Sequence, residues 1–345
     1  MIIIKRQLPI GFLVNSTAKL PIYTDLSTTN QFRLFVFEPA NIDWQTNTAH
    51  GLLLNRGHWF WKRRQLPKVI YNRIYPESKL VNSKLQQLPD QIILFNQVTQ
   101  FDKWQVYQSL QTNQLVKQHL PASYPYDPEH LPDLINKHHK LILKPKKGHQ
   151  GVGIWRLELL ENESYALYRD LEFPAILPNN PLTLALVNLI IDPELYLIQE
   201  YLDFQTIDGQ HFDVRILVQK NQKGQWEVTA ALSRIAKSNY FITNISDRSV
   251  KGFTLLQRLN LPALAIMTNI EQISKETAQT LEKDFGHLGE ISVDFGLDQQ
   301  AKPWIIEVNG KPNKELFNEI LPTKTISKIY LQPILYGQYL NSLSH

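Results

Sequence analysis

The sequence contains no cysteine in 345 residues. This absence excludes disulfides, thiolate metal ligands and cysteine nucleophiles, and it fits a protein of the reducing cytoplasm. A long apolar run is also missing, because residues 182–191 are interrupted by Thr183 and Asn188 and are too short to cross a bilayer. Met1–Arg6 carries its charge after its apolar residues, so we expect a first strand there and no signal peptide. These absences predict a cytoplasmic location and no membrane partner.

The charge balance shows no strong excess of either sign. Net charge is +4, with 43% hydrophobic and 20% charged residues, which is the composition of an ordinary globular protein. The excess is too small to indicate nucleic-acid binding by itself. A chain of this length is expected to divide into two or three domains.

Short apolar runs separated by turn residues fill the first part of the chain. Residues 32–37, 69–74 and 92–95 are predicted strands, and residues 78–87 a short helix between two of them. This alternation predicts a small α/β domain over residues 1–98.

Residues 102–119 are predicted to form a helix, which Pro121 ends. Strands at 140–145 and 153–157 are expected to flank a glycine loop. In residues 211–219 apolar and polar side chains alternate, and residues 226–231 form the return strand of a hairpin. A helix that starts near Glu271 leads to Gly286 as its C-terminal cap.

Two β-rich stretches near the C-terminus carry oxygen ligands where a core strand is normally apolar. Glu307 and Asn309 lie two residues apart, so they share one face of a strand. If this strand pairs with residues 290–295, Asp294 joins them. Two carboxylates and an amide suit Mg²⁺ held between protein and phosphates. The alternative is three polar residues on half-exposed strands.

The loop between the two middle strands combines lysine with glycine. Lys144, Lys146, Gly148, Gly151 and Gly153 could neutralise phosphate and let backbone N–H groups approach it. The loop is neither a P-loop nor a Rossmann fingerprint, because a strand follows it. We interpret it as a hairpin flap over a nucleotide, and a solvated basic turn is the alternative.

Other candidates are spread along the chain. Lys103 in the first turn of its helix is unfavourable unless it meets an anion. Gln199–Leu202 is an apolar strand whose backbone could bind an adenine edge with help from Glu200. Asp213 could bind ribose or a cation, and Arg215 and Arg234 could reach phosphates. Each of these has an ordinary salt-bridge or solvent-exposed alternative.

In this order the pieces resemble the ATP-grasp superfamily. More closely, the chain is similar to the YheC/YheD family of endospore coat-associated proteins. The resemblance extends over nearly the whole chain and is strongest from Lys103 onward. It rests on the site residues above and on four further stretches: residues 71–74, 234–237, 243–246 and 307–312.

The resemblance implies an α+β ATP-grasp fold, in which a small N-terminal α/β pre-ATP-grasp domain precedes two α+β subdomains that hold ATP between them. The domains would span residues 1–98, 99–200 and 201–345. It implies a Mg²⁺-dependent ligase, with Mn²⁺ as the alternative ion, that joins a carboxylate to an amine through an acyl phosphate and releases ADP and phosphate.

The implied roles follow the motif positions. The expected catalytic residues are Lys144, Arg234 and Asn244. The expected ATP-binding residues are Lys103, Lys144, Lys146, Gly148, Gly151, Gly153, Gln199, Glu200, Tyr201, Leu202, Asp213 and Arg215. The expected metal ligands are Asp294, Glu307 and Asn309. Arg73 is a further candidate for holding a carboxylate.

One departure from the family pattern concerns the second substrate. Many relatives have adjacent glycines after Ser246, whereas this chain has Asp247–Gly252. A nucleotide-binding component of the spore coat without turnover is therefore the main alternative function, with coat proteins as partners. Residues 56–64 interleave basic and aromatic residues, which makes single-stranded nucleic-acid binding a weaker alternative.

Overall fold

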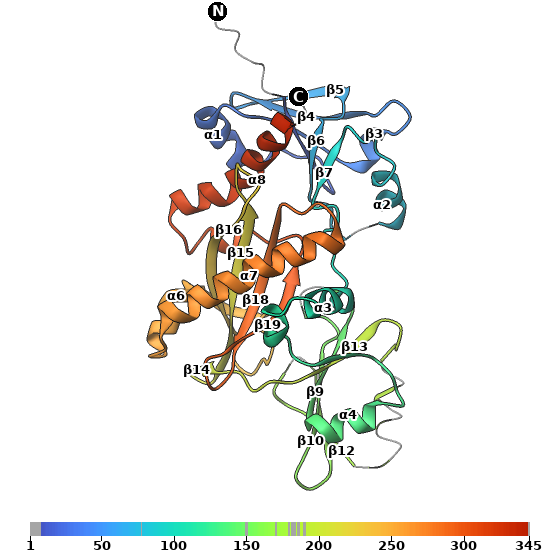
Figure 1. The fold of residues 1–345 in the computed structure, drawn as a ribbon, viewed down its shortest axis with the longest axis vertical. Coiled ribbons are helices and arrows are strands. Elements are labelled where there is room, and N and C mark those ends of the chain that lie inside the picture. The colour runs from blue at the N-terminus through green and yellow to red at the C-terminus, as the bar shows by residue number, and fades with distance from the viewer. Residues whose placement is uncertain are drawn as a thin grey trace, which may run out of the picture.

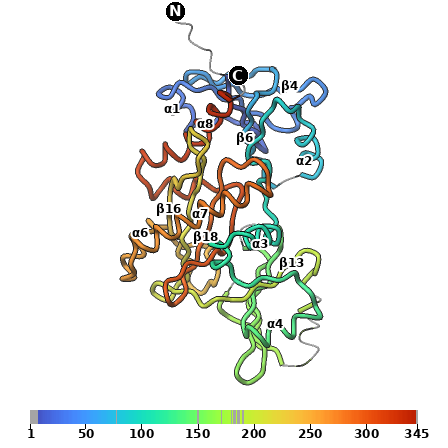
Figure 2. The backbone as a smooth tube through the Cα atoms, viewed as in Figure 1, coloured from blue at the N-terminus to red at the C-terminus, as the bar shows by residue number. Residues whose placement is uncertain are grey.

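Three β-sheets follow one another along the length of the molecule (Figure 1). The computed structural model describes residues 8–343 apart from 77, 149–150, 170, 179, 181–183, 185–186 and 189–190. The predicted first strand at Met1–Arg6 and the middle of the glycine loop therefore lie outside the described residues. The tube in Figure 2 shows that the chain returns at its C-terminal end to the N-terminal domain.

The N-terminal sheet has the order β3-β4-β2-β1-β6-β7, with β5 paired to β4. Its strands are β1 (Ile10–Leu13), β2 (Arg33–Phe37), β3 (Ile42–Asp43), β4 (Thr48–Asn55), β5 (His58–Gln65), β6 (Val69–Asn72) and β7 (Ile93–Phe95). Helices α1 (Pro21–Asn30) and α2 (Lys79–Leu85) connect them, and η1 (Pro39–Asn41) precedes β3. The predicted α/β alternation is confirmed, with boundaries within about two residues.

The C-terminal helix α8 (Thr323–Leu343) covers part of this sheet. It packs together with α1 against one face of the sheet, where Ile334, Tyr336 and Leu340 join the core formed by Phe12 and Tyr71. Burial of this apolar face is expected to be a major stabilising contribution.

The second sheet carries the glycine flap. Its order is β12-β11-β10-β9-β13-β8, and α4 (Leu131–His138) packs against β9 and β10. The strands are β8 (Ser123–Pro125), β9 (Lys140–Pro145), β10 (Trp155–Leu159), β11 (Tyr165–Arg169), β12 (Ala175–Leu177) and β13 (Tyr196–Glu200). The predicted strand–loop–strand arrangement is confirmed, because β9 and β10 pair antiparallel.

The third sheet has the order β17-β16-β15-β18-β19, with β14 on β15. Its strands are β14 (Thr206–Ile207), β15 (Gln210–Lys220), β16 (Trp226–Ala236), β17 (Ser246–Val250), β18 (Glu290–Leu297) and β19 (Pro303–Asn309), and η3 (Glu315–Phe317) follows them. Helices α6 (Gly252–Arg258) and α7 (Ala263–Phe285) pack against the face that carries Phe212, Val214 and Ile216.

Two predicted helix boundaries are wrong. The helix expected over 102–119 divides into α3 (Lys103–Gln111) and η2 (Val116–His119). It breaks because the Asn113 side chain accepts hydrogen bonds from the N–H groups of Leu115 and Val116. Helix α7 begins at Ala263, before the predicted start near Glu271, because buried Ile266 and Ile270 extend its apolar face.

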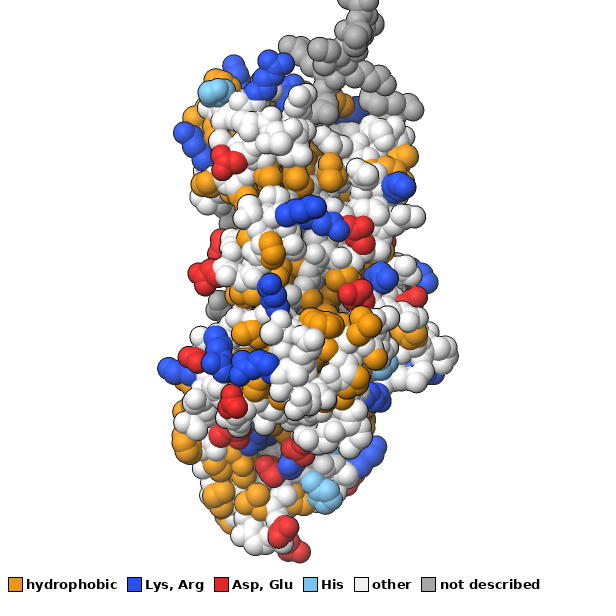
Figure 3. Space-filling view, turned by 90° about the vertical axis from the view of Figure 1, so that its left-hand side faces the viewer, with side chains coloured by type: hydrophobic (Ala, Val, Ile, Leu, Met, Phe, Trp, Pro, Cys, Tyr) orange, Lys and Arg blue, Asp and Glu red, His pale blue; other side chains and the backbone are white. Residues whose placement is uncertain are grey.

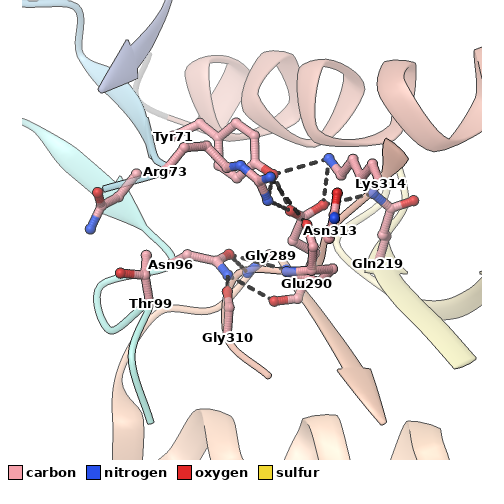
Figure 4. A network of polar contacts seen from close by, with 12 residues as sticks. Tyr71, Arg73, Asn96, Thr99, Gln219, Gly289, Glu290, Gly310, Asn313 and Lys314 are labelled. Atoms are coloured by element: carbon pink, nitrogen blue, oxygen red, sulfur yellow. Dashed lines mark hydrogen bonds and ion pairs between the residues drawn. The ribbon is translucent and has the colours of Figure 1, made fainter. Parts of the chain in front are cut away.

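Glu290 joins the N-terminal domain to the third sheet (Figure 4). Its buried carboxylate contacts the Tyr71 hydroxyl and lies 2.7 Å from both Arg73 Nη1 and Lys314 Nζ. Burial alone would raise the pKa of Glu290, but these two cations hold this pKa below its usual range. One buried carboxylate therefore faces two cations.

His287 lies at the same interdomain contact and gives a pH prediction. Burial, with help from nearby Lys220 and against the effect of Glu282, lowers its pKa to about 4. Because the unfolded chain takes up this proton near pH 6.5 and the native protein does not, His287 should make stability fall as pH drops from 6.5 to 4. The expected loss is about 2–3 kcal/mol.

Urea unfolding of the wild type and His287→Gln at pH 7, 5.5 and 4.5 measures this loss. Only the wild type should show the histidine contribution, so its free energy of unfolding should fall more steeply than that of the variant. Parallel pH profiles would contradict the assignment.

Candidate functional site

A row of charged side chains crosses one face of the third sheet, opposite the face covered by α6 and α7. The strand registers set this row: Asp213 is opposite Arg234, Arg215 is opposite Asp294, and Asp294 is opposite Glu307. Because side chains alternate between faces, the apolar partners of β15 go to the core and the charged ones to this row. The predicted hairpin that brings Asp294 to Glu307 is confirmed.

Two arginines hold Asp294. Its Oδ1 accepts from Arg215 Nε at 2.7 Å, and its Oδ2 accepts from Arg215 Nη2 at 2.6 Å and Arg234 Nη2 at 2.8 Å. Burial would raise the pKa of Asp294, but these guanidinium groups hold it below the usual range. Both oxygens of the carboxylate are therefore engaged.

Arg234 is fixed from the other side by Asp213. The carboxylate of Asp213 is fully buried, accepts from the Arg234 guanidinium and contacts the Thr243 hydroxyl. The structure thus places Asp213 behind Arg234, where its carboxylate orients this arginine. Asn244, whose Oδ1 accepts from Arg234 Nη1 at 3.2 Å, lies beside it.

Two lysines from other elements meet this row. Lys103, the first residue of α3, lies 3.2 Å from Glu307 Oε1. Lys144 on β9 donates to Gln199 Oε1 at 2.8 Å and to the Ile306 carbonyl at 3.4 Å. Burial and the positive charge of nearby Lys103 lower the pKa of Lys144 to about 8, although Glu307 acts in the opposite direction. Gln199 therefore positions Lys144.

The described part of the flap is folded down onto the site. The Lys146 carbonyl accepts from the Lys103 N–H at 2.8 Å. Gly151 has a φ of 76°, and an added Cβ would approach Ile242 Cδ1 to 2.6 Å, so glycine is needed there. The Lys146 ammonium donates to the Glu194 carbonyl at 2.9 Å, a partner outside the cavity linings described below.

Two cavities meet at the charged row. The hinge cavity is bounded by Ile142, Ile154, Tyr201, Leu202, Phe204 and Ile306, together with Gln199, Glu200 and Lys144. The cationic cavity, of about 570 Å³, is lined by Arg73, Tyr75, Arg215, Arg234, Asn309 and Lys311. Lys103, Asn244 and Glu307 line both. A larger hollow between α2, α3 and the end of α7 contains none of the predicted site residues.

In the segment Gln199–Leu202 the Glu200 carboxylate is engaged, whereas the backbone of Leu202 is not. Glu200 Oε1 accepts from the Ala122 N–H at 2.7 Å, and Glu200 Oε2 lies 3.4 Å from His138 Nδ1. The Tyr201 N–H donates to the Lys140 carbonyl. Leu202 lines the cavity, and its backbone has no hydrogen-bond partner in the described part of the chain.

Sequence reasoning missed the apolar walls of the hinge cavity, Phe204 and Ile306, and the cation Lys311. Burial, with help from the neighbouring Arg73, lowers the pKa of Lys311 to about 8. Lys311 could have been found from the sequence, because it follows the expected metal ligand Asn309 by two residues within the stretch 307–312. The guanidinium of Arg73, a candidate for holding a carboxylate, is already bonded to Glu290 and to the Pro312 carbonyl.

Glu307, Asn309 and Asp294 are the oxygen donors that a divalent cation could use at this site. Three or more acidic or histidine side chains do not gather into a metal-type cluster among the residues the structure describes. Glu307 and Asn309 nevertheless share a strand face, and Asn309 Nδ2 is buried without a hydrogen-bond partner in this part of the chain, which a bound ligand oxygen would complete. These two residues fit an oxygen-liganded ion such as Mg²⁺, and Asp294 fits only if it shares its oxygens with the arginines.

The three-sheet arrangement with its flap is the fold of ATP-grasp proteins. Solved ATP-grasp enzymes share this fold: N5-carboxyaminoimidazole synthetase from Staphylococcus aureus superimposes with a TM-score of 0.58 at 12% identity, covering 96% of this chain and 77% of that one. D-alanine-D-alanine ligase from Coxiella burnetii gives 0.52 at 13% identity, covering 97% and 94%. A RiPP-associated ATP-grasp ligase from Chryseobacterium gregarium, solved with ADP and a leader and core peptide, gives 0.52 at 14% identity, covering 95% and 97%.

Sequence comparison then gives the family. The model of the YheC/D-like ATP-grasp family matches residues 91–340, and the chain belongs to this family. The Bacillus subtilis endospore coat-associated protein YheD is 32% identical over 302 residues, and this alignment covers 82% of this chain but only 65% of YheD. YheC from the same organism is 22% identical over 325 residues, covering 90% of this chain and 88% of YheC.

Residues 56–64, considered above for nucleic-acid binding, lie in the hairpin of β4 and β5. Arg56 and Gly57 form the turn between β4 and β5, and Phe60 and Trp61 are about half exposed on β5. On the face shown in Figure 3, both signs of charge occur along the whole length, whereas a continuous basic stripe is typical of nucleic-acid binding. No helix in the described residues is long and apolar enough to span a membrane.

Proposed function

We propose that this protein is an ATP-dependent carboxylate–amine ligase that forms an acyl phosphate and releases ADP and phosphate. The observation that carries the proposal is the meeting of the hinge cavity and the cationic cavity at Lys103, Asn244 and Glu307. One cavity is apolar enough for an adenine, and the other is lined by cations that suit a carboxylate. The shared residues lie where phosphates would have to be.

In this proposal the hinge cavity binds adenine between Ile142 and Ile306, with the free backbone of Leu202 reading its edge. Lys103 and Lys144 bind the phosphates beneath the flap. Glu307 and Asn309, with a shared Asp294, would hold Mg²⁺, which would supply charge neutralisation on the phosphates. Lys103, which pairs with Glu307 in this structure, would exchange that carboxylate for phosphate.

The residues of the chain contribute to the reaction by stabilising negative charge on the transferred phosphoryl group. A carboxylate oxygen of the first substrate forms a bond to the γ-phosphorus while the bond to the β–γ bridging oxygen breaks, and ADP leaves. Arg234, which Asp213 and Asn244 hold in position, faces the negative charge on the transferred group. The amine then attacks the acyl carbon and loses a proton, and phosphate leaves. The closed flap excludes water from the acyl phosphate.

The comparisons support this proposal through the ligases that share the fold, one of them solved with ADP and peptides. An amino acid or peptide is therefore the substrate class we propose. The names of YheD and YheC support a spore-associated location with coat proteins as partners. This chain spans about two thirds of the length of YheD, 65%.

Incubation of the purified protein with MgATP and pooled amino acids or short peptides tests the reaction. We expect stoichiometric ADP and a product lighter than the summed substrates by one water. AMP and pyrophosphate would instead indicate an adenylate mechanism and contradict the proposal.

A second candidate function is a nucleotide-binding coat component without turnover. It is favoured by the engagement of Asp294 with two arginines and of Glu307 with Lys103, which leaves the expected metal ligands neutralised by the protein itself. Tight MgATP binding without ADP release across all substrate pools would support it.

A further inference from the structure

Lys311 stands out among the cations of the cationic cavity because no carboxylate lies within ion-pair distance of it among the described residues. It is half-buried, and its ammonium lies 5.6 Å from the centre of the Tyr75 ring. A cation that is partly removed from water and has no opposite charge costs free energy unless an anion joins it.

The other cations that line this cavity are already paired. Lys103 is paired with Glu307, and Arg215 and Arg234 with Asp294. Glu290 neutralises only one of the two cations that it contacts, Arg73 and Lys314. Together with Lys311, this end of the cavity carries an excess of positive charge. Glu315 also lines the cavity, but its side chain is exposed at the rim.

The backbone on both sides of Lys311 is held in place. The Gly310 carbonyl accepts from Asn96 Nδ2 at 2.6 Å, and the Pro312 carbonyl accepts from Arg73 Nη2 at 3.1 Å. A Cβ on Gly310 would approach the Thr99 carbonyl to 3.0 Å, so the loop lies directly against residues 98–99. Figure 4 shows Asn96, Arg73 and Gly310 in this arrangement. The cation is thus carried on a fixed loop, as expected of a binding residue.

Lys311 lies in the part of the cationic cavity that is not shared with the hinge cavity. Lys103, Asn244 and Glu307 line both cavities, whereas Lys311, Tyr75 and Arg73 line only the cationic cavity. A substrate with one group near Arg234 and a second, negative group at Lys311 would use both parts of this cavity.

We propose that Lys311 anchors a carboxylate that does not react, so that the substrate of this cavity is an acidic compound: an amino acid or peptide with a carboxylate in addition to its reacting group. This rests on the proposed function for the identity of the reacting end. Arg73 acts as a positioning residue, because its guanidinium is bonded to Glu290 and Pro312 and holds the loop.

Calorimetry with glutarate as the probe, on protein saturated with MgADP, tests the anchor. Glutarate should bind the wild type at least tenfold more tightly than glutaramide, the neutral diamide of the same length. Lys311→Gln should weaken glutarate binding by about ten- to hundredfold, the range that a charge-assisted hydrogen bond provides. Lys311→Arg should retain most of it, and MgADP affinity should be unchanged in both variants.

Lys223→Gln is the matched control, because Lys223 is exposed and lies outside both cavities. Equal glutarate affinity in the wild type and Lys311→Gln, no binding of glutarate, or no preference for glutarate over glutaramide would each overturn the proposal. If Lys311→Gln does not fold, Lys311→Met, which keeps the length of the apolar stem and removes the charge, takes its place in the same comparison. Glutarate binding without ADP release in any substrate pool would overturn the ligase function and leave the carboxylate site standing.

Discussion

Glu307→Gln is expected to reduce ADP formation by about three orders of magnitude and to weaken MgATP binding. Glu307 lines both cavities and pairs with Lys103 at 3.2 Å, so the change removes charge at the point where phosphates and metal would meet. A metal ion stabilises a transferring phosphoryl group by several kcal/mol, and about 4 kcal/mol corresponds to about a thousandfold in rate. The change keeps the size of the side chain, so folding should be preserved.

Glu319→Gln is the control for this experiment, because Glu319 is exposed and lies outside both cavities. Its ADP formation and MgATP affinity should equal those of the wild type. Calorimetry with MgATP and a coupled ADP assay measure both quantities. Unchanged affinity together with unchanged turnover in Glu307→Gln would exclude this residue from the metal site.

Glu290→Gln is expected to lower the free energy of unfolding by about 3–5 kcal/mol, since removing one partner of a buried ionic cluster leaves charges without compensation. Arg73 and Lys314 would both lose their carboxylate, and Gln219, which donates to Glu290 Oε2 at 2.7 Å, would lose a charged acceptor. Urea unfolding measures the change, with Glu319→Gln at an exposed position of the following segment as control. A loss equal to that of the control would show that the cluster contributes little to stability.

The local part of the site could be predicted from the sequence, whereas its long-range part could not. The alternation in β15 places Asp213 and Arg215 on the face opposite Phe212, Val214 and Ile216, and the short β18–β19 connection brings Asp294 to Glu307. Both follow from the period of a strand and the register of a hairpin. The overall ATP-grasp architecture followed from the order of the motifs.

Contacts between distant segments were not accessible in this way. The sequence does not show that the Glu200 carboxylate is taken by the Ala122 N–H and His138, or that Lys146 turns toward residue 194. These contacts depend on how separate elements dock, which local propensity does not determine. The break of α3 at Asn113 was missed for a related reason, because its side-chain hydrogen bonds compete with a helix whose apolar pattern continues.

The packing of α8 against the N-terminal sheet has a consequence for biosynthesis. On the ribosome the strands of this sheet emerge before those of the second and third sheets, and the helix that covers one of its faces emerges only after all of them. Until α8 has been synthesised, the apolar surface around Phe12 and Tyr71 lacks the side chains of this helix. Such exposed apolar surface favours chaperone binding or aggregation. A chain truncated before Thr323 should show rapid proteolysis within its first sheet, and equal protease resistance of the truncated and full chains would contradict this order of assembly.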